Sequence, residues 1–243
     1  MRSAITSQSP ASRDGKRPRP ARLVIAALGA ILASLCAVTA GDARQTPAPA
    51  GTGAVVVYRK VFKSSSPEFT EIRVPGEGVG SCDQRNLDDE PDPQAVEFSP
   101  ALRARIFALA ADLGYFRGIT LDIQRRIAYL GEKTFRYERG GEASEVKFNY
   151  TLNPKANQLL QIFEGLAREQ EEITTLARRM KYDRLGVNDT LQQIDEDIRH
   201  QVLAQPERFL PLLEQIAGDE RFLDIARKRA RSLADYIRSS GAL

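Results

Sequence analysis

Cysteine and histidine, which often carry catalytic or metal-binding chemistry, are scarce in this sequence. Its 243 residues include two cysteines, Cys36 and Cys82, and one histidine, His200. A zinc or transition-metal site needs about three or four soft or imidazole ligands, so these residues do not supply one. Cys82 and His200 could form a nucleophile and base, but no third residue in the sequence supports such a pair. We therefore predict no metal, no cofactor and no catalytic residues.

Two short motifs resemble catalytic signatures without their context. Residues 144–147 are Ser-Glu-Val-Lys, the S-x-x-K pattern of penicillin-binding enzymes. Those enzymes place the motif at the start of a helix and also carry Ser-Asp-Asn and Lys-Thr-Gly, whereas here it falls on a predicted strand. Residues 76–80 are Gly-Glu-Gly-Val-Gly, but no helix follows to receive a phosphate. We interpret the first motif as a chance match and the second as turn glycines.

Carboxylates supply the remaining candidates for chemistry. Asp88, Glu90 and Asp92 could offer oxygen ligands to Ca²⁺, but a loop beginning at Asp88 lacks the EF-hand glycine and has Ser99 where the EF-hand has its final glutamate. We predict a solvated acidic loop. A carboxylate-dependent hydrolase would use acids whose spacing shows no pairing. These are Asp112, Asp122 and Glu132.

Residues 1–40 have the composition of an export segment. Residues 1–22 hold six basic residues and one acid, and an apolar run follows from residue 23 to residue 40. The run ends in Val38-Thr39-Ala40, which has the small-x-small pattern of a signal-peptide cleavage site. We predict cleavage between Ala40 and Gly41 and a periplasmic or secreted location for the rest of the chain.

Two alternatives to cleavage stay open. The apolar run 23–40 is about as long as the shortest transmembrane helices, so it could remain as an anchor. Cys36 could accept a lipid, but such sites have a small residue before the cysteine, and here that residue is Leu35. Basic residues favour the cytoplasmic side, so each alternative still exports the rest of the chain. A membrane is an expected partner only if residues 23–40 are retained.

The charge of the exported part argues against a nucleic-acid partner. Residues 1–40 contain six of the 35 basic residues and one of the 32 acidic residues, so the remainder has a net charge of about −2. Binding to a phosphate backbone needs a clustered positive excess. The run 227–231, Arg-Lys-Arg-Ala-Arg, is predicted to spread around the solvated face of a helix. We expect a protein or envelope partner of unknown identity.

Hydrophobic alternation predicts a first group of strands. Residues 54–62 are apolar on both faces, as in an interior strand, and residues 69–74 alternate as a half-buried strand does. A weaker strand around Cys82 and a short strand within residues 94–99 complete a meander. Cys82 would be the only cysteine of the exported chain, and we predict that it is buried.

A second group of strands forms a predicted hairpin. Apolar residues at odd positions predict a strand over 127–137, and a two-residue turn at 140–141 reverses it. This turn pairs Arg136 with Glu145, whereas a four-residue loop would set Glu138 against Glu145, so cross-strand charge favours the tight turn. We interpret the apolar face as core beneath a helix, with an open ligand platform as the alternative. That face carries Phe135, Tyr137, Val146, Phe148 and Tyr150.

Helices are predicted where a capping residue and a proline precede an apolar stripe. Ser99 caps a helix that ends at Gly114, and Asn153 caps another that continues to about Met180. Three further stripes predict helices in the last quarter of the chain. They comprise Val187, Leu191, Ile194, Ile198 and Val202; Phe209, Leu213 and Ile216; and Phe222, Ala226, Ala230, Leu233 and Ile237.

The order of these elements resembles uncharacterised exported bacterial domains, in which a meander and a helix precede further strands and a closing helix. The resemblance covers residues 54–180 and rests on ALRARIFALAADLGYFRG and EVKFNYTLNPKANQLLQIFEGL. It implies a fold and an envelope setting, and no function. We predict an α+β fold, with an antiparallel sheet of about five to seven strands, two packed helices and a C-terminal helical extension. The predicted parts are a signal peptide or uncleaved anchor (1–40), a flexible tether (41–53), an α+β domain (54–182) and a helical C-terminal region (183–243).

Three functional hypotheses follow from these features. Export without a convergent set of catalytic residues favours a non-catalytic envelope or secreted protein, which binds a macromolecule through its helical C-terminal part or an exposed sheet face. A small-ligand binder using the aromatic sheet face is the alternative. The carboxylate-dependent hydrolase is the third hypothesis.

The mature N-terminus tests the export prediction. N-terminal sequencing of the protein recovered from the cell envelope or medium should begin at Gly41, because Ala40 completes the cleavage pattern. An N-terminus upstream of Ala37 would contradict cleavage at this position.

Overall fold

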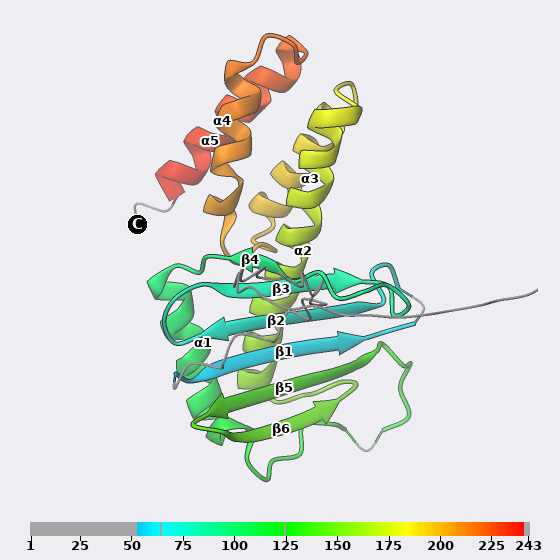
Figure 1. The fold of residues 1–243 in the computed structure, drawn as a ribbon, viewed down its shortest axis with the longest axis vertical. Helices are drawn as coiled ribbons and strands as arrows, with labels where there is room; N and C mark the ends of the chain where they lie inside the picture. The colour runs from blue at the N-terminus through cyan, green and yellow to red at the C-terminus, as the bar shows by residue number, and fades with distance from the viewer. Residues whose placement is uncertain (1–52, 64, 124, 241–243) are drawn as a thin grey trace, which may run out of the picture. The chain divides into compact units, whose positions relative to one another are not determined.

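The structure is a computed structural model that describes residues 53–63, 65–123 and 125–240. In these residues a six-stranded antiparallel sheet is packed with helices, and further helices follow at the C-terminal end (Figure 1). The predicted α+β fold is therefore confirmed. Residues 1–52, which include the predicted cleavage site after Ala40, lie outside the described residues.

The sheet carries the predicted meander. Its strands are β1 (Val55–Val61), β2 (Phe69–Pro75), β3 (Gly80–Arg85), β4 (Gln94–Val96), β5 (Glu132–Arg139) and β6 (Glu142–Phe148). Their order is β4-β3-β2-β1-β5-β6, so β5 returns to the free side of β1 and makes β1 an interior strand. Val56, Val57 and Tyr58 are all buried, as the apolar residues on both faces of this strand predicted.

The hairpin between β5 and β6 has the predicted register. Arg136 lies opposite Glu145, and their Nη1 and Oε2 atoms are 3.2 Å apart. Gly140 and Gly141 have φ angles of 60° and 85°, which a two-residue turn of this kind requires and glycine adopts without strain. The predicted two-residue turn, favoured because it sets opposite charges across from each other, is therefore confirmed.

The strand predicted to begin at Ile127 begins instead at Glu132. Gly131 has a φ of 93°, and a Cβ there would lie 2.7 Å from the Cβ of Phe62. The chain thus turns tightly against the end of β1 before it enters the sheet. Ile127 and Tyr129 are exposed, so their odd positions belong to a loop and not to a buried strand.

In the part of the chain that the structure describes, five α-helices accompany the sheet. They are α1 (Pro100–Asp112), α2 (Pro154–Tyr182), α3 (Val187–Arg199), α4 (Leu210–Gly218) and α5 (Asp224–Ser240), with short 3₁₀ helices η1 (Gly114–Phe116) and η2 (Pro206–Phe209). Both predicted caps are confirmed. The Ser99 hydroxyl accepts a hydrogen bond from the Leu102 N–H, and the Asn153 side chain accepts from Lys155 and Ala156.

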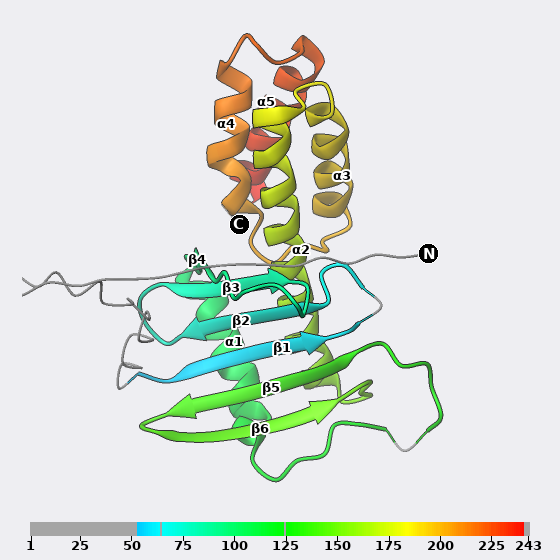
Figure 2. The same ribbon diagram turned by 45° about the vertical axis from the view of Figure 1, so that its right-hand side comes forward.

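The buried apolar residues form two separate cores. The first joins the inner face of the sheet to α1 and to α2 residues from Ala156 to Leu166, and the second joins α2 from Leu176 onward to α3, α4 and α5. Figure 2 shows α2 continuing from the sheet into the helical region. At 29 residues, or roughly 43 Å, it is the element that belongs to both cores.

The apolar stripe predicted over residues 187–202 ends before Val202. α3 stops at Arg199, Gln201 has a φ of 55°, and the Val202 side chain is 43% exposed. The reason is that the chain leaves the helix here to cross α2. We refer to residues 200–205, between α3 and η2, as the linker.

Gly165 allows the linker to cross α2 closely. A Cβ at this position would lie 2.6 Å from the Val202 carbonyl oxygen and 3.1 Å from the Ala204 nitrogen. Real Cβ atoms do not approach backbone oxygen so closely, so a larger residue would push the linker away. Glycine in the middle of a helix costs up to about 1 kcal/mol relative to alanine, and the crossing accounts for its presence.

Gly165→Ala should destabilise the protein, because overpacking against backbone costs about 1–3 kcal/mol and outweighs the gain in helix propensity. Urea unfolding of the chain from Gly41 onward measures the effect. Gly218→Ala is the matched control, because a Cβ at this α4 position meets no atom within 4 Å and should be neutral or mildly stabilising. Equal stabilities of the two variants would contradict the close crossing.

Candidate functional site

A groove of about 750 Å³ runs along α2 beside the junction of the two cores. Its lining comes from α2 between Gln158 and Glu171, from strands β1 to β3 and the 65–67 connection, from α1, and from linker residues 200–204. The sheet, both of its helices and the linker therefore build one site.

More than half of the residues that line this groove are polar. The amides are Gln84, Gln158, Gln161 and Gln201; the hydroxyl groups are Tyr58, Ser65, Ser66 and Thr70; and the charged groups are Lys60, Arg105, Arg168, Glu164 and Glu171. Each amide can donate and accept hydrogen bonds. Small-molecule sites are usually mostly apolar with a few polar groups, so this groove suits a ligand rich in hydrogen-bonding groups.

The Glu164 carboxylate is held by two neighbours in the groove. It accepts hydrogen bonds from the Tyr58 hydroxyl at 2.7 Å and from Lys60 Nζ at 3.1 and 3.2 Å. Burial, together with the nearby Glu164 charge, raises the pKa of Tyr58 well above its usual range, so the phenol stays protonated. The three groups thus form a satisfied cluster and do not leave Glu164 free as a base.

Arg168 links the groove to the C-terminal helices. Its Nε donates to Asp197 of α3 and lies 3.4 Å from Glu172. The Glu172 oxygens have no hydrogen-bond donor among the described residues, and burial followed by the neighbouring Asp197 raises the pKa of Glu172. The protonated Glu172 can then donate to Asp197, whose pKa is lowered by Glu172 and Arg168 although burial opposes the shift.

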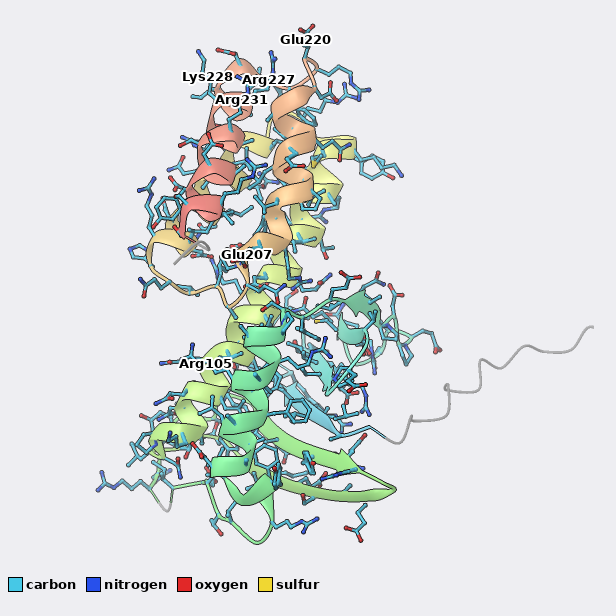
Figure 3. The ribbon with its side chains drawn as sticks, turned by 90° about the vertical axis from the view of Figure 1, so that its left-hand side faces the viewer. Arg105, Glu207, Glu220, Arg227, Lys228 and Arg231 are labelled. Carbon is cyan, nitrogen blue, oxygen red and sulfur yellow. The ribbon has the colours of Figure 1, made fainter. Side chains whose placement is uncertain are left out.

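Arg105 is the exposed cation of the groove. It projects outward from α1 and forms no ion pair among the described residues (Figure 3). Lys60 and Arg168, by contrast, each neutralise an acid. Arg105 and the exposed Glu171, which likewise forms no ion pair among the described residues, are therefore the charges available to an incoming ligand.

Glu169 lies on the buried side of α2 next to the groove and is fully buried. It accepts a hydrogen bond from the Gln205 N–H and lies 3.3 Å from Arg208 Nη1. Burial raises the pKa of Glu169 to about 7 although both donors oppose the rise. Gln205 extends the connection to α1, since its side-chain oxygen accepts from the Ser99 N–H at 3.0 Å. The linker is thus bound to both helices that pack on the sheet.

His200 lines this groove and Cys82 does not, so the two residues do not form a nucleophile and base in it. Cys82 is in the first core, as predicted, and burial raises the pKa of its thiol to about 12, so it stays protonated. His200 is exposed and lines the groove.

The other sequence candidates have structural roles. Ser144 and Lys147 lie on strand β6, so the S-x-x-K match is not at a helix start. Ser144 donates to the Tyr115 carbonyl, and Lys147 pairs with Glu132 of β5. Asp112 pairs with Lys155, and Asp122 accepts from the backbone of Asn149 and Tyr150. The acidic loop at Asp88, Glu90 and Asp92 is exposed. Within the described residues, no three acidic, cysteine or histidine side chains are grouped to hold a metal.

The aromatic face of the hairpin is core. Phe135, Tyr137, Val146 and Phe148 are buried beneath helices, as the sequence favoured, whereas Tyr150 is 41% exposed. These rings therefore offer no open platform for a ligand.

The outer face of the sheet carries neutralised charges. Its ion pairs are Arg59–Glu71, Arg73–Glu71, Arg73–Glu138, Arg136–Glu138 and Arg136–Glu145. Opposite charges alternate across four strands, so each cation already has a partner. This face is less suited than the groove to bind a charged ligand.

Sequence reasoning missed Glu169, although a signal was present. The predicted α2 seam includes Leu159, Ile162, Leu166, Ile173, Leu176 and Met180. Its alternating steps of three and four residues place Glu169 on the same seam. An acid at a seam position must be buried with partners, which is what the structure shows. The groove glutamines carried no comparable signal because each is isolated in the sequence.

Comparisons with known proteins do not assign a function. No protein-family model matches the sequence, and no curated protein matches it. Across residues 53–240, apart from the two undescribed positions, no helix is long and apolar enough to cross a membrane. The groove is therefore the basis on which a function is proposed.

Glu169→Gln should change the pH dependence of stability. The Glu169 pKa rises from 4.5 to about 7 on folding, so the folded state binds an extra proton between these values. The contribution of Glu169 to the free energy of unfolding should fall as pH rises through this interval, by up to about 1.4 kcal/mol per pH unit, and level off above pH 7. Glu172, whose pKa is raised to about 8, continues to titrate above that pH. The glutamine keeps an acceptor for Gln205 and removes this contribution. Urea unfolding at several pH values measures it.

Glu171→Gln is the control for this experiment. Glu171 is exposed on α2, so its replacement should leave the wild-type pH profile in place. An unchanged slope in Glu169→Gln would show that Glu169 is not the group that titrates.

Proposed function

We propose that the protein is a non-catalytic exported interaction protein that binds an extended segment of a partner protein in the groove along α2. The observation that carries the proposal is the lining of that groove, in which amide and hydroxyl side chains from the sheet, the 65–67 connection, α2 and the linker face one cavity. An extended polypeptide presents unpaired N–H and C=O groups along its length, and glutamine can bond to either.

The chemistry of the lining favours a polypeptide over a flat or apolar ligand. The aromatic residue of the lining is Tyr58, whose buried ring stacks on Phe163 with centroids 5.1 Å apart. It is not available to stack on a sugar or a base. Arg105 and Glu171 add one accessible positive and one accessible negative charge, which favours a segment that carries both a carboxylate and a basic group.

The pairing of charges supports a binding role rather than catalysis. Glu164 is occupied by Tyr58 and Lys60, and Arg168 by Asp197. Ser65 donates its hydroxyl hydrogen to nearby backbone carbonyls. A hydrolase would need a nucleophile or water-activating base free of such partners.

The expected compartment narrows the kind of partner. The export pattern of residues 1–40 and the resemblance to exported bacterial domains both support an envelope or secreted protein as the occupant. The net charge of about −2 for residues 41–243 supports a protein over a nucleic acid.

Photo-crosslinking in the native cell tests the proposal. A benzophenone amino acid at Gln161, exposed in the groove, should form one defined adduct with another protein, whereas the same probe at exposed Gln215 of α4 should not. When Gln158→Ala and Gln201→Ala are introduced into the protein that carries the probe at Gln161, the yield of the adduct should fall by roughly tenfold or more. The reason is that each lost hydrogen bond contributes about 1 kcal/mol to the binding free energy. Equal adducts at both probe positions, or turnover of an ester or peptidoglycan substrate by the mature protein, would contradict it.

A further inference from the structure

The end of the helical region farthest along α2 is built from two chain turns. One turn, residues 183–186, connects α2 to α3, and the other, residues 219–223, connects α4 to α5. The two are neighbours, because Arg229 near the start of α5 donates to the Asn188 carbonyl at 3.1 Å and to its side chain at 2.6 Å. Figure 3 shows Glu220, Arg227, Lys228 and Arg231 gathered at this end.

Large apolar side chains are exposed on both turns. Tyr182 is 73% exposed, Leu185 72%, Leu223 45% and Ile225 55%. Turns are usually polar, so four such residues at one end are unusual. These four side chains are not part of the second core. At this end of the helical region its buried residues are Met180, Val187, Phe222 and Ala226. We refer to Tyr182, Leu185, Leu223 and Ile225, with the basic residues around them, as the distal tip.

The positive charge of the exported chain is concentrated at the distal tip. Residues 178–189 and 217–231 contain nine basic and five acidic residues, an excess of four positive charges. Residues 41–243 as a whole carry about −2, so the remainder carries about −6. Lys181 Nζ lies 4.9 Å from the centre of the Tyr182 ring, which places cationic and aromatic groups together.

We propose that the distal tip binds the surface of an anionic membrane. Exposed leucine and isoleucine side chains can enter the boundary between headgroups and acyl chains, tyrosine favours that interface, and clustered basic residues are attracted to anionic lipids. The tip is formed by two turns and contributes no residue to the groove along α2. A pair of projecting turns suits a broad lipid surface, whereas an acidic protein partner would be expected to meet a shaped recess.

This interaction goes beyond the proposed function and uses a different surface. Groove residues on α2 end at Glu171, and the tip begins after them at residue 178. A partner segment and a membrane could therefore be bound together. The tip would bring the groove close to the membrane even when residues 1–40 are removed.

Vesicle co-sedimentation of the chain from Gly41 onward tests the proposal, since the described residues all belong to one compact unit. The protein should sediment with vesicles of phosphatidylglycerol and phosphatidylcholine, and much less with phosphatidylcholine alone. Leu185→Ser with Ile225→Ser should weaken binding by roughly tenfold or more, and Lys181→Glu with Arg184→Glu should do the same. High salt should weaken the wild-type interaction.

Matched controls separate the tip from other surfaces. Val79→Ser with Leu152→Ser removes two exposed apolar side chains outside the tip and should leave binding intact. Gln158→Ala with Gln201→Ala should also leave it intact, so failure of the groove proposal and failure of this one are distinguishable. Circular dichroism should show that every variant folds.

Three outcomes would overturn the proposal. They are no sedimentation with anionic vesicles, equal binding by the tip variants and the wild type, and binding to soluble poly-glutamate without binding to vesicles. The last result would assign the tip to an acidic protein partner.

Discussion

The buried carboxyl group of Glu169 is the interaction on which the junction of the molecule depends. α2 contributes apolar residues to the first core up to Leu166 and to the second from Leu176, and Glu169 lies between them. A buried acid is costly unless donors surround it, and here the linker supplies Gln205 and η2 supplies Arg208. The chain between α3 and α4 is thereby drawn across α2 at Gly165.

That crossing creates the groove. If the linker passed farther from α2, its residues 200–204 would not face the glutamines of α2 and the sheet. Lys60, Glu164 and Arg168 are paired with neighbours, which leaves amides, hydroxyl groups, Arg105 and Glu171 for a ligand. This combination is the basis of the proposed binding of a polar segment, and the groove lies where three parts of the fold meet.

Charge is distributed unevenly along residues 41–243. On the sheet, alternating arginine and glutamate side chains neutralise one another across neighbouring strands, and exposed pairs of this kind contribute little to stability individually. At the distal tip, basic residues exceed acidic ones and surround exposed apolar side chains. The protein therefore presents a polar groove and an amphipathic tip, connected by a single helix.

The sequence by itself determined the local structure. Ser99 and Asn153 were recognisable as helix caps, Gly140 and Gly141 as a tight turn, and Cys82 as buried, because these features depend on residues close in the chain or on simple alternation. Only the tertiary structure decided where Ile127 and Val202 lie, since their spacing suited a strand and a helix that close approaches at Gly131 and Gly165 interrupt. The groove likewise needed the fold, because its polar residues come from distant segments that meet only when α2 joins both cores.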